Sequence, residues 1–180
     1  MIIFMGLAGS GKSTMGHFLA AHLGCPWVST GNLLREKMDA KTQAEMLQGK
    51  IVSDEQTLDV LNEEFRRIGA HNHQFVLDGS PRTMRQAQWL VQKAQNGELK
   101  ITAVIHLNID KDAAKERLLA RRRPDDHEQA ITERFSEYDE AIVPILDYLK
   151  SEGCKVHEIN AAQPPHQVES DIAKALGIEL

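Results

Sequence analysis

The stretch from Gly6 to Ser13 constrains the fold of this chain more than any other, because it reads Gly-Leu-Ala-Gly-Ser-Gly-Lys-Ser and satisfies the pattern G-x-x-x-x-G-K-[ST]. The apolar run 2–5 directly before it predicts a buried strand, and a helix is predicted to begin near Lys12. In such a loop, backbone amides and the positive end of the helix converge on one anion. The sequence therefore predicts a phosphate site, in which Lys12 reaches the outer phosphates and Ser13 can bind Mg²⁺. A glycine-rich turn with a surface lysine is the alternative, which the strand and helix on either side disfavour.

Segments with the periods of strands and helices alternate along the rest of the chain. A helical pattern follows each of the apolar runs that predict strands, which lie at about 2–5, 26–30, 75–78, 101–109 and 154–159. Strands that alternate with helices favour a parallel sheet with helices packed on both faces. Because 180 residues fit one domain with a sizeable core, we expect an α/β fold with a five-stranded parallel β-sheet.

Helix starts can be predicted at several positions. Ser53 and Asp110 each precede a helical pattern, and both residue types are favoured as N-caps. Asp125, with Glu128 three residues later, is expected to cap the long helix that follows. The segment 38–50 gives no clear prediction.

Composition and charge argue against several classes of function. The chain carries 26 acidic and 21 basic residues, a formal net charge of −5, which argues against nucleic acid or an anionic membrane as the main partner. No apolar run approaches the ~18 residues that a membrane span needs, and no basic leader precedes the first strand, so we expect a cytoplasmic protein. Cys25 and Cys154 stand alone and far apart, which signals neither a zinc site nor a disulfide framework.

Asp78 ends the apolar run at 75–77, which is predicted to be a buried strand. Open parallel sheets bind ligands at the carboxyl ends of their strands, so Asp78 should face the phosphates on the loop. A carboxylate at this place can hold Mg²⁺, directly or through water. An aspartate that caps a turn is the alternative, and the loop at 6–13 favours the metal site.

Arginines form the second signal. Arg117 and Arg121 lie four residues apart on one predicted helix, so they share a face and repel each other unless an anion lies between them. A polyphosphate whose transferred group gains charge is a natural counter-ion for them and for Arg123. Arg35 and Arg82 come shortly after predicted strand ends, where they can bind a second phosphate.

These features resemble those of the adenylate kinase family of nucleoside monophosphate kinases over nearly the whole chain. The matching pieces, in order, are 6–12, 29–35, 49–54, 77–86, Arg117 with Arg121, and 123–126 with Arg134. The resemblance implies a P-loop NTPase fold in a single kinase domain, residues 1–180. It also implies a phosphotransferase that moves the terminal phosphoryl group of MgATP to a nucleoside monophosphate, with AMP as the favoured acceptor and no covalent intermediate.

The resemblance assigns roles to residues at the matching positions. The residues implied to bind ATP are Gly9, Ser10, Gly11, Lys12, Ser13, Thr14, Arg117 and Arg121. Those implied to bind AMP are Thr30, Gly31, Arg35, Val52, Gly79, Arg82 and Gln86. Gln86 would read the adenine edge, and the two arginines would bind the phosphate. The catalytic residues would be Lys12, Arg82, Arg117, Arg121, Arg123 and Arg134. Ser13 and Asp78 would hold the Mg²⁺ cofactor.

The chain departs from the family pattern in the two segments that would cover the substrates. A monophosphate-binding insert is expected at about 30–60 and is shortened, and the lid, at about 122–132, is nearly absent. Asn32 stands where the family usually has an aspartate near the Mg²⁺ waters, and Ser80 replaces the usual phenylalanine beneath the monophosphate. With Asp125 as a helix cap, we expect the short lid to be a rigid corner that carries arginine.

Two alternatives stay open at the level of sequence. One is a kinase for CMP, UMP or a small metabolite. Thr30 and Gln86 argue against it, because they match the positions that read adenine in the family. The other is a nucleotide-binding sensor with little turnover, which Asn32 and the short lid favour and the many arginines disfavour. We expect a monomer whose partners are ATP and a nucleoside monophosphate, with neither nucleic acid nor membrane as a partner.

Overall fold

A sheet of five parallel strands forms the centre of the structure, a computed structural model that describes residues 1–179. The strands are β1 (Ile2–Gly6), β2 (Trp27–Ser29), β3 (Val76–Asp78), β4 (Ala103–Asn108) and β5 (Val156–Asn160). They lie in the order β2-β3-β1-β4-β5, so that Ile3 of β1 stands opposite Leu77 on one side and Val104 on the other. The predicted α/β fold with a five-stranded parallel sheet is confirmed.

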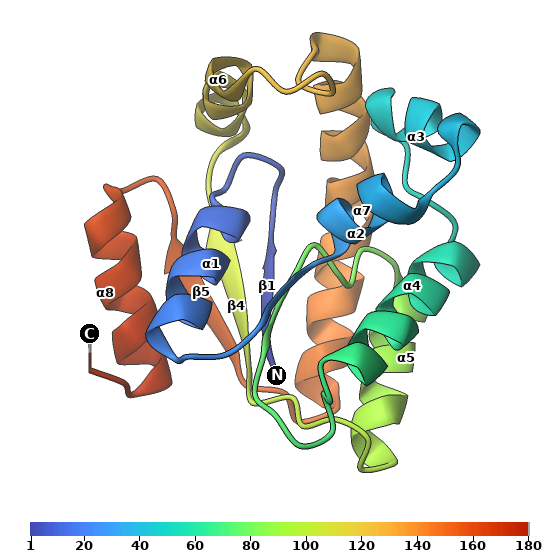
Figure 1. Cartoon of the computed structure of the whole chain (residues 1–180). Coiled ribbons are helices and arrows are strands. Elements are labelled where there is room, and N and C mark those ends of the chain that lie inside the picture. Colours follow the sequence, from blue (N-terminus) through green and yellow to red (C-terminus); the bar gives the residue numbers. More distant parts are fainter. Residues whose placement is uncertain (180) are drawn as a thin grey trace.

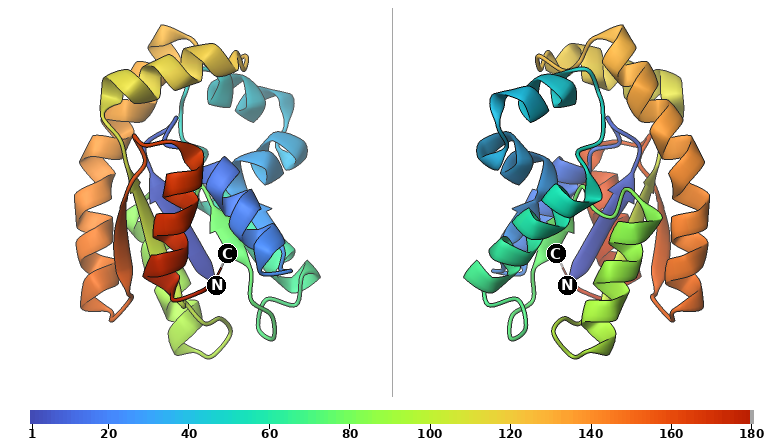
Figure 2. Two further views of the ribbon diagram at one scale, coloured as in Figure 1. Left: turned by 90° about the vertical axis from the view of Figure 1, so that its left-hand side faces the viewer. Right: turned by 90° about the vertical axis from the view of Figure 1, so that its right-hand side faces the viewer.

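Helices cover both faces of this sheet (Figures 1 and 2). They are α1 (Lys12–His22), α2 (Thr30–Lys37), α3 (Ala40–Leu47), α4 (Asp54–Arg67), α5 (Met84–Gln95), α6 (Lys111–Arg121), α7 (Glu128–Ser151) and α8 (Pro165–Leu176). Helices α1 and α8 pack on one face, and α4, α5 and α7 pack on the other. Helices α3 and α6 lie toward the upper end of the molecule in Figure 1, beyond the carboxyl ends of the strands.

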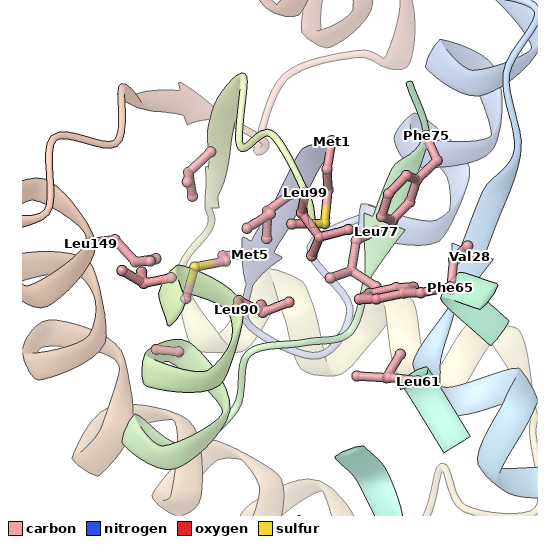
Figure 3. Packing of buried hydrophobic residues seen from close by; sticks show 14 of the residues in the cluster. Met1, Met5, Val28, Leu61, Phe65, Phe75, Leu77, Leu90, Leu99 and Leu149 are labelled. Carbon is pink, nitrogen blue, oxygen red and sulfur yellow. The ribbon is translucent and has the colours of Figure 1, made fainter. Parts of the chain in front are cut away.

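Alternate side chains of β1 enter two different cores, as the period of a strand requires. Ile3 and Met5 belong to the cluster under α4, α5 and α7, part of which Figure 3 shows. Ile2 and Phe4 belong to the cluster under α1 and α8. Because both faces of β1 are buried, the strand reads as a continuous apolar run in the sequence. Since β1 is the central strand, the loop that follows it lies at the centre of the sheet edge.

Two of the predicted helix starts are confirmed by the hydrogen bonds of their caps. Ser53 Oγ accepts a hydrogen bond from the N–H of Gln56 (3.3 Å) at the start of α4, and Asp110 Oδ1 accepts one from the N–H of Ala113 (2.8 Å) at the start of α6. The segment 38–50, for which the sequence gives no clear prediction, contains α3.

The predicted cap of α7 is wrong. His127 is the N-cap, and its Nδ1 accepts a hydrogen bond from the N–H of Ala130. Asp125 forms an ion pair with Arg134 instead. A charge-assisted bond to a guanidinium is stronger than a bond to a neutral amide, so the carboxylate turns toward the arginine and leaves the helix end to the imidazole.

None of the helices in the described part of the chain is long and apolar enough to cross a bilayer.

Candidate active site

A cavity of about 890 Å³ opens at the carboxyl edge of the sheet, between the phosphate loop, α2, the segment after β3, α6 and α7. All residues that the sequence analysis proposes for nucleotide binding, metal binding or catalysis line this cavity. They are Gly9, Ser10, Gly11, Lys12, Ser13, Thr14, Thr30, Gly31, Arg35, Val52, Asp78, Gly79, Arg82, Gln86, Arg117, Arg121, Arg123 and Arg134. The fold thus brings together side chains that are up to 125 residues apart in the chain (Gly9 to Arg134, 134 − 9).

The phosphate loop between β1 and α1 takes a shape that requires glycine at two positions. Gly9 has a φ of +86°, and a Cβ there would lie 2.5 Å from the carbonyl oxygen of Ala114. Gly11, the N-cap of α1, has a φ of +92° and offers no side chain to the first amides of the helix. Between them, Ser10 is buried, and its Oγ has no hydrogen-bond partner within residues 1–179. Free amides at a helix start and an unpartnered hydroxyl suit a bound phosphate.

Lys12 folds back over the loop. Its Nζ donates hydrogen bonds to the carbonyl oxygens of Gly6 and Leu7, both at 2.8 Å. Burial lowers the pKa of Lys12 to about 8; the charge of Asp78 opposes this shift, and the arginines of the cleft add to it. The cleft therefore holds an excess of positive charge, which a polyphosphate would neutralise.

Ser13 and Asp78 lie side by side at the loop. Ser13 Oγ donates a hydrogen bond of 2.6 Å to Asp78 Oδ2, and the pairing of Asp78 with Phe4 brings the end of β3 next to the end of β1. A hydroxyl and a carboxylate are hard oxygen ligands, and Mg²⁺ is bound through one or two such groups together with substrate phosphates and water. The pair therefore fits Mg²⁺ on a bound nucleotide. In the described part of the chain, no group of three His, Cys, Asp or Glu side chains is placed to hold a metal ion.

Asp126 organises the arginines at the corner between α6 and α7. Its carboxylate accepts two hydrogen bonds from the guanidinium of Arg121, at 2.7 and 2.9 Å, and one of 3.0 Å from the N–H of Arg123. Arg134, which pairs with Asp125, has its Nη1 3.7 Å from Asp126. Burial alone would raise the pKa of Asp126, but the hydrogen bonds and charges of these arginines hold that pKa below its usual value. An ionised carboxylate thus fixes arginines from both helices around the cavity.

The other arginines of α6 are placed by the backbone around them. Arg117 Nη1 donates a hydrogen bond of 2.9 Å to the carbonyl oxygen of Ala161, in the loop after β5. Arg122 ends α6 in the left-handed conformation, with φ 58° and ψ 38°. This conformation ends the helix and turns the chain away, so that Arg123 reaches the cavity.

Arg35 and Arg82 form a second cationic group, on the side of the cavity that α2 and the segment after β3 supply. Arg35 Nη2 donates to Asn32 Oδ1 (2.6 Å), and Arg82 Nε donates to the carbonyl oxygen of Gly79 (3.0 Å). Burial between the cavity walls lowers the pKa of both guanidinium groups, and the other arginines nearby lower it further. Arg82 is nevertheless open to the water of the cleft. Within residues 1–179 neither arginine pairs with a carboxylate, so both can bind a phosphate.

Gln86 is buried, and both atoms of its amide are hydrogen-bonded. Oε1 accepts from the N–H of Arg82 (2.8 Å) and from Ser80 Oγ (3.3 Å), and Nε2 donates to Asp54 Oδ1 (2.9 Å). Ser80 Oγ also accepts a hydrogen bond of 3.1 Å from Thr30 Oγ1. Ser80 therefore links Thr30 and Gln86, the two residues predicted to read the acceptor base.

The sequence model of the family described as "Adenylate kinase" matches residues 4–154. This span contains the phosphate loop, Asp78 and all of the arginines described above. The chain belongs to the adenylate kinase family.

Relatives in this family are similar over almost the full chain. "Adenylate kinase 1" of Nostoc sp. is 33% identical over 182 residues, which cover 98% of each chain. "Adenylate kinase 1" of Synechocystis sp. is 33% identical over 181 residues, which cover 96% of this chain and 95% of the relative. "Adenylate kinase" of Corynebacterium urealyticum is 35% identical over 153 residues, 82% of this chain and 84% of the relative.

Three polar residues of this adenylate kinase family member take part in the site without a role in the sequence analysis. Asp54 and Asp126 bind predicted site residues, and Thr57 of α4 lines the cavity, buried, with no hydrogen-bond partner for its Oγ1 in the described chain. Asp54 sits in a capping pattern, which already accounts for an aspartate there. The role of Asp126 could have been predicted from its position three residues after Arg123, because acidic residues beside clustered arginines commonly pair with them.

Proposed function

We propose that the protein transfers the terminal phosphoryl group of MgATP to AMP, forming two molecules of ADP. The observation that carries this proposal is that one cavity has two separate cationic groups, the phosphate loop with Lys12 and the pair Arg35 and Arg82. One nucleotide needs only the first group, and a second unpaired group suits a second phosphate-bearing substrate. Membership of the adenylate kinase family supports the same reaction.

The transfer needs positioning and charge neutralisation more than covalent chemistry. A phosphate oxygen of AMP attacks the terminal phosphorus of ATP while the bond from that phosphorus to the bridging oxygen breaks, so one ADP forms on each side. Lys12 and the loop amides would bind the ATP phosphates, and Arg117, Arg121, Arg123 and Arg134, which line the same cavity, would stabilise the charge of the transferred group. Ser13 and Asp78 would hold Mg²⁺, which when bound neutralises part of the phosphate charge.

We also assign the two segments that cover the substrates. Residues 30–60, which contain α2 and α3, are proposed as the AMP-binding insert, and residues 122–132 as a short lid. The chain between α6 and α7 consists only of residues 122–127, so the corner there is too small to cover the cavity alone. Exclusion of water from the site is then shared between this corner and the insert.

Contacts between the insert and α7 support this division. Leu47 O accepts a hydrogen bond of 3.0 Å from Nε2 of His127, and the N–H of Ile51 donates one of 3.3 Å to Glu137 Oε1. Gly49 approaches so closely that a Cβ there would lie 2.6 Å from the carbonyl oxygen of Ala130. The insert therefore packs against the start of α7, the helix that carries Arg134.

The alternatives from the sequence are less well supported. Family membership and the polar group around Gln86 favour AMP over CMP, UMP or another metabolite. The number of arginines that line the cavity together with Lys12 favours turnover over a sensor, because binding alone does not need so many of them. Since one chain lines the whole cavity, we propose that the monomer is active, which sedimentation of the active enzyme would test. The cytoplasmic location stays a prediction for cell fractionation.

A coupled assay of ADP formation tests the proposal. With MgATP as donor and AMP, CMP, UMP or GMP as acceptor, we expect the highest kcat/KM with AMP. Lys12→Ala is the control for the site, and it should abolish transfer while the protein stays folded, because the Lys12 ammonium bonds to carbonyl oxygens of the phosphate loop and lies outside the apolar core. Preference for a pyrimidine nucleotide would contradict the proposed acceptor, and no ADP with any acceptor would contradict the proposed activity.

A further inference from the structure

We propose that Asp54 determines acceptor specificity as a positioning residue: it orients the amide of Gln86 so that Gln86 offers a donor, and not an acceptor, to the base. This inference rests on the proposed function, because it concerns the base of the acceptor nucleotide. Asp54 begins α4 and Gln86 lies in the first turn of α5, and a hydrogen bond of 2.9 Å joins the two side chains.

The hydrogen bonds of the Gln86 amide leave one position open. A carboxamide has two acceptor positions on its oxygen and two N–H donors on its nitrogen. Both acceptor positions are used, by the N–H of Arg82 and by Ser80 Oγ. One donor is used by Asp54 Oδ1. The remaining polar position is a single N–H, and Gln86 lines the cavity.

The orientation of this amide is fixed by the chemistry of its partners. The backbone N–H of Arg82 can only donate, and an ionised carboxylate can only accept. Rotating the amide by half a turn would place its NH₂ against the N–H of Arg82 and its oxygen against Asp54. Gln86 is 1% exposed, so water cannot replace the lost partners.

Asp54 is itself held in place. Its Oδ1 also accepts a hydrogen bond of 2.7 Å from Thr83 Oγ1. Thr83 is the N-cap of α5, where its Oγ accepts from the N–H of Gln86. The cap of α5, the carboxylate of α4 and the amide of Gln86 therefore form one connected group, and Asp54 is its acceptor.

A single N–H donor selects bases by one ring nitrogen. The N1 of adenine carries a lone pair and can accept, whereas the N1 of hypoxanthine and guanine carries a hydrogen and would face the donor without a bond. A site built around such a bond rejects the wrong base strongly, because the buried donor would be left unpaired. The geometry thus favours a 6-aminopurine monophosphate and disfavours a 6-oxopurine one of the same size.

The test compares AMP with IMP as acceptors and as ligands. Asp54→Ala should raise the KM for AMP about tenfold with a smaller change in kcat, and should narrow the ratio of kcat/KM between AMP and IMP about tenfold or more. Asp54→Asn should keep most of the discrimination, because its Oδ1 can still accept from Gln86. Glu55→Ala is the control, because Glu55 lies in the same turn of α4 and is exposed. This substitution removes the same charge from the start of α4, but the ratio of kcat/KM between AMP and IMP should not change.

If Asp54→Ala lowers kcat/KM by the same factor for AMP and for IMP, Asp54 has a structural role alone and the inference is overturned. The inference is also overturned if Glu55→Ala narrows the ratio of kcat/KM between AMP and IMP as much as Asp54→Ala does. Should Asp54→Ala melt below the assay temperature, Asp54→Ser gives the same test, because serine keeps a small polar side chain at the first position of α4 but its hydroxyl is too short to reach Gln86.

Calorimetric binding of AMP and IMP separates this inference from the proposed function. A ratio of dissociation constants that narrows in Asp54→Ala supports the role of Asp54 even where no ADP forms, in which case only the proposed reaction fails. If Asp54→Ala forms ADP but leaves the ratio of the AMP and IMP dissociation constants unchanged, the proposed reaction stands and the proposed role of Asp54 is wrong. A wild-type protein that does not bind AMP overturns both.

Discussion

Raising the pH should remove the charge of Lys12 and with it the binding of ATP. Burial, together with the nearby arginines, lowers the pKa of Lys12 from 10.5 to about 8. Because the protonated amine is the form that binds phosphate, activity is present below pH 8 and is lost as the pH rises through that value. From pH 7.5 to 9.5 the protonated fraction should fall from about three quarters to about 3%, roughly 25-fold.

The measurement is the pH dependence of two kinetic constants for ATP. With both substrates far below saturation, kcat/KM reports the free enzyme and should fall by about this factor, whereas kcat reports the complex. Bound phosphates raise the pKa of Lys12 again, so kcat should stay nearly constant up to pH 9.5. The substrate phosphates are fully ionised throughout this range and add no slope of their own.

Lys12→Arg is the control, because a guanidinium keeps its charge in this range. Its kcat/KM should be lower than that of the wild type and independent of pH. A wild-type kcat/KM that stays constant up to pH 9.5 would refute the argument that burial and neighbouring arginines lower this pKa. A parallel fall in Lys12→Arg would assign the titration to another group.

Three further predictions concern the metal, the corner and the insert. Asp78→Asn should raise the Mg²⁺ concentration for half-maximal transfer about tenfold, with little change in the KM for AMP, as a Mg²⁺ titration would show. Asp126→Asn should lower the free energy of unfolding by about 2 kcal/mol in urea, because Arg121 loses a buried bidentate partner while staying partly open to water. Gly49→Ala should raise ATP hydrolysis without AMP, relative to transfer, because its Cβ would lie 2.6 Å from a carbonyl oxygen of α7 and displace the insert.

Each of these has a result that contradicts it. An unaltered Mg²⁺ titration in Asp78→Asn would remove that residue from the metal site. An unchanged urea midpoint in Asp126→Asn would mean that the arginines are held in place without its charge. For Gly49→Ala the control is Gly97→Ala, where φ is also positive (+75°) but a Cβ would meet nothing within 4 Å. If both alanine variants hydrolyse ATP equally, backbone strain and not the contact with α7 is the cause.

The features that the sequence predicted correctly are those whose physical causes lie close together in the chain. The strand, loop and helix around Gly9 and Lys12 follow from a pattern of eight residues, and the caps at Ser53 and Asp110 follow from a bond to an amide three residues later. The parallel sheet follows from alternation alone. Helix α3 was not predicted because it follows no apolar run, although its N-cap Asp39, which accepts a hydrogen bond from the N–H of Thr42, is a local signal. Its other end is held by His127, 80 residues later in the chain.

The corner between α6 and α7 shows why the details of the site could not be predicted in the same way. Whether Asp125 caps α7 depends on Arg134, which the helix brings back toward it only once α7 has formed. His127 takes over the cap and at the same time donates from Nε2 to Leu47 O, 80 residues earlier in the chain. Both bonds need the neutral imidazole with its proton on Nε2, because Nδ1 must accept from Ala130. The start of α7 and the insert are therefore coupled through one ring, and displacement of the insert from α7 would loosen the corner where Asp126 holds Arg121 and Arg123, two of the arginines that we propose for phosphoryl transfer.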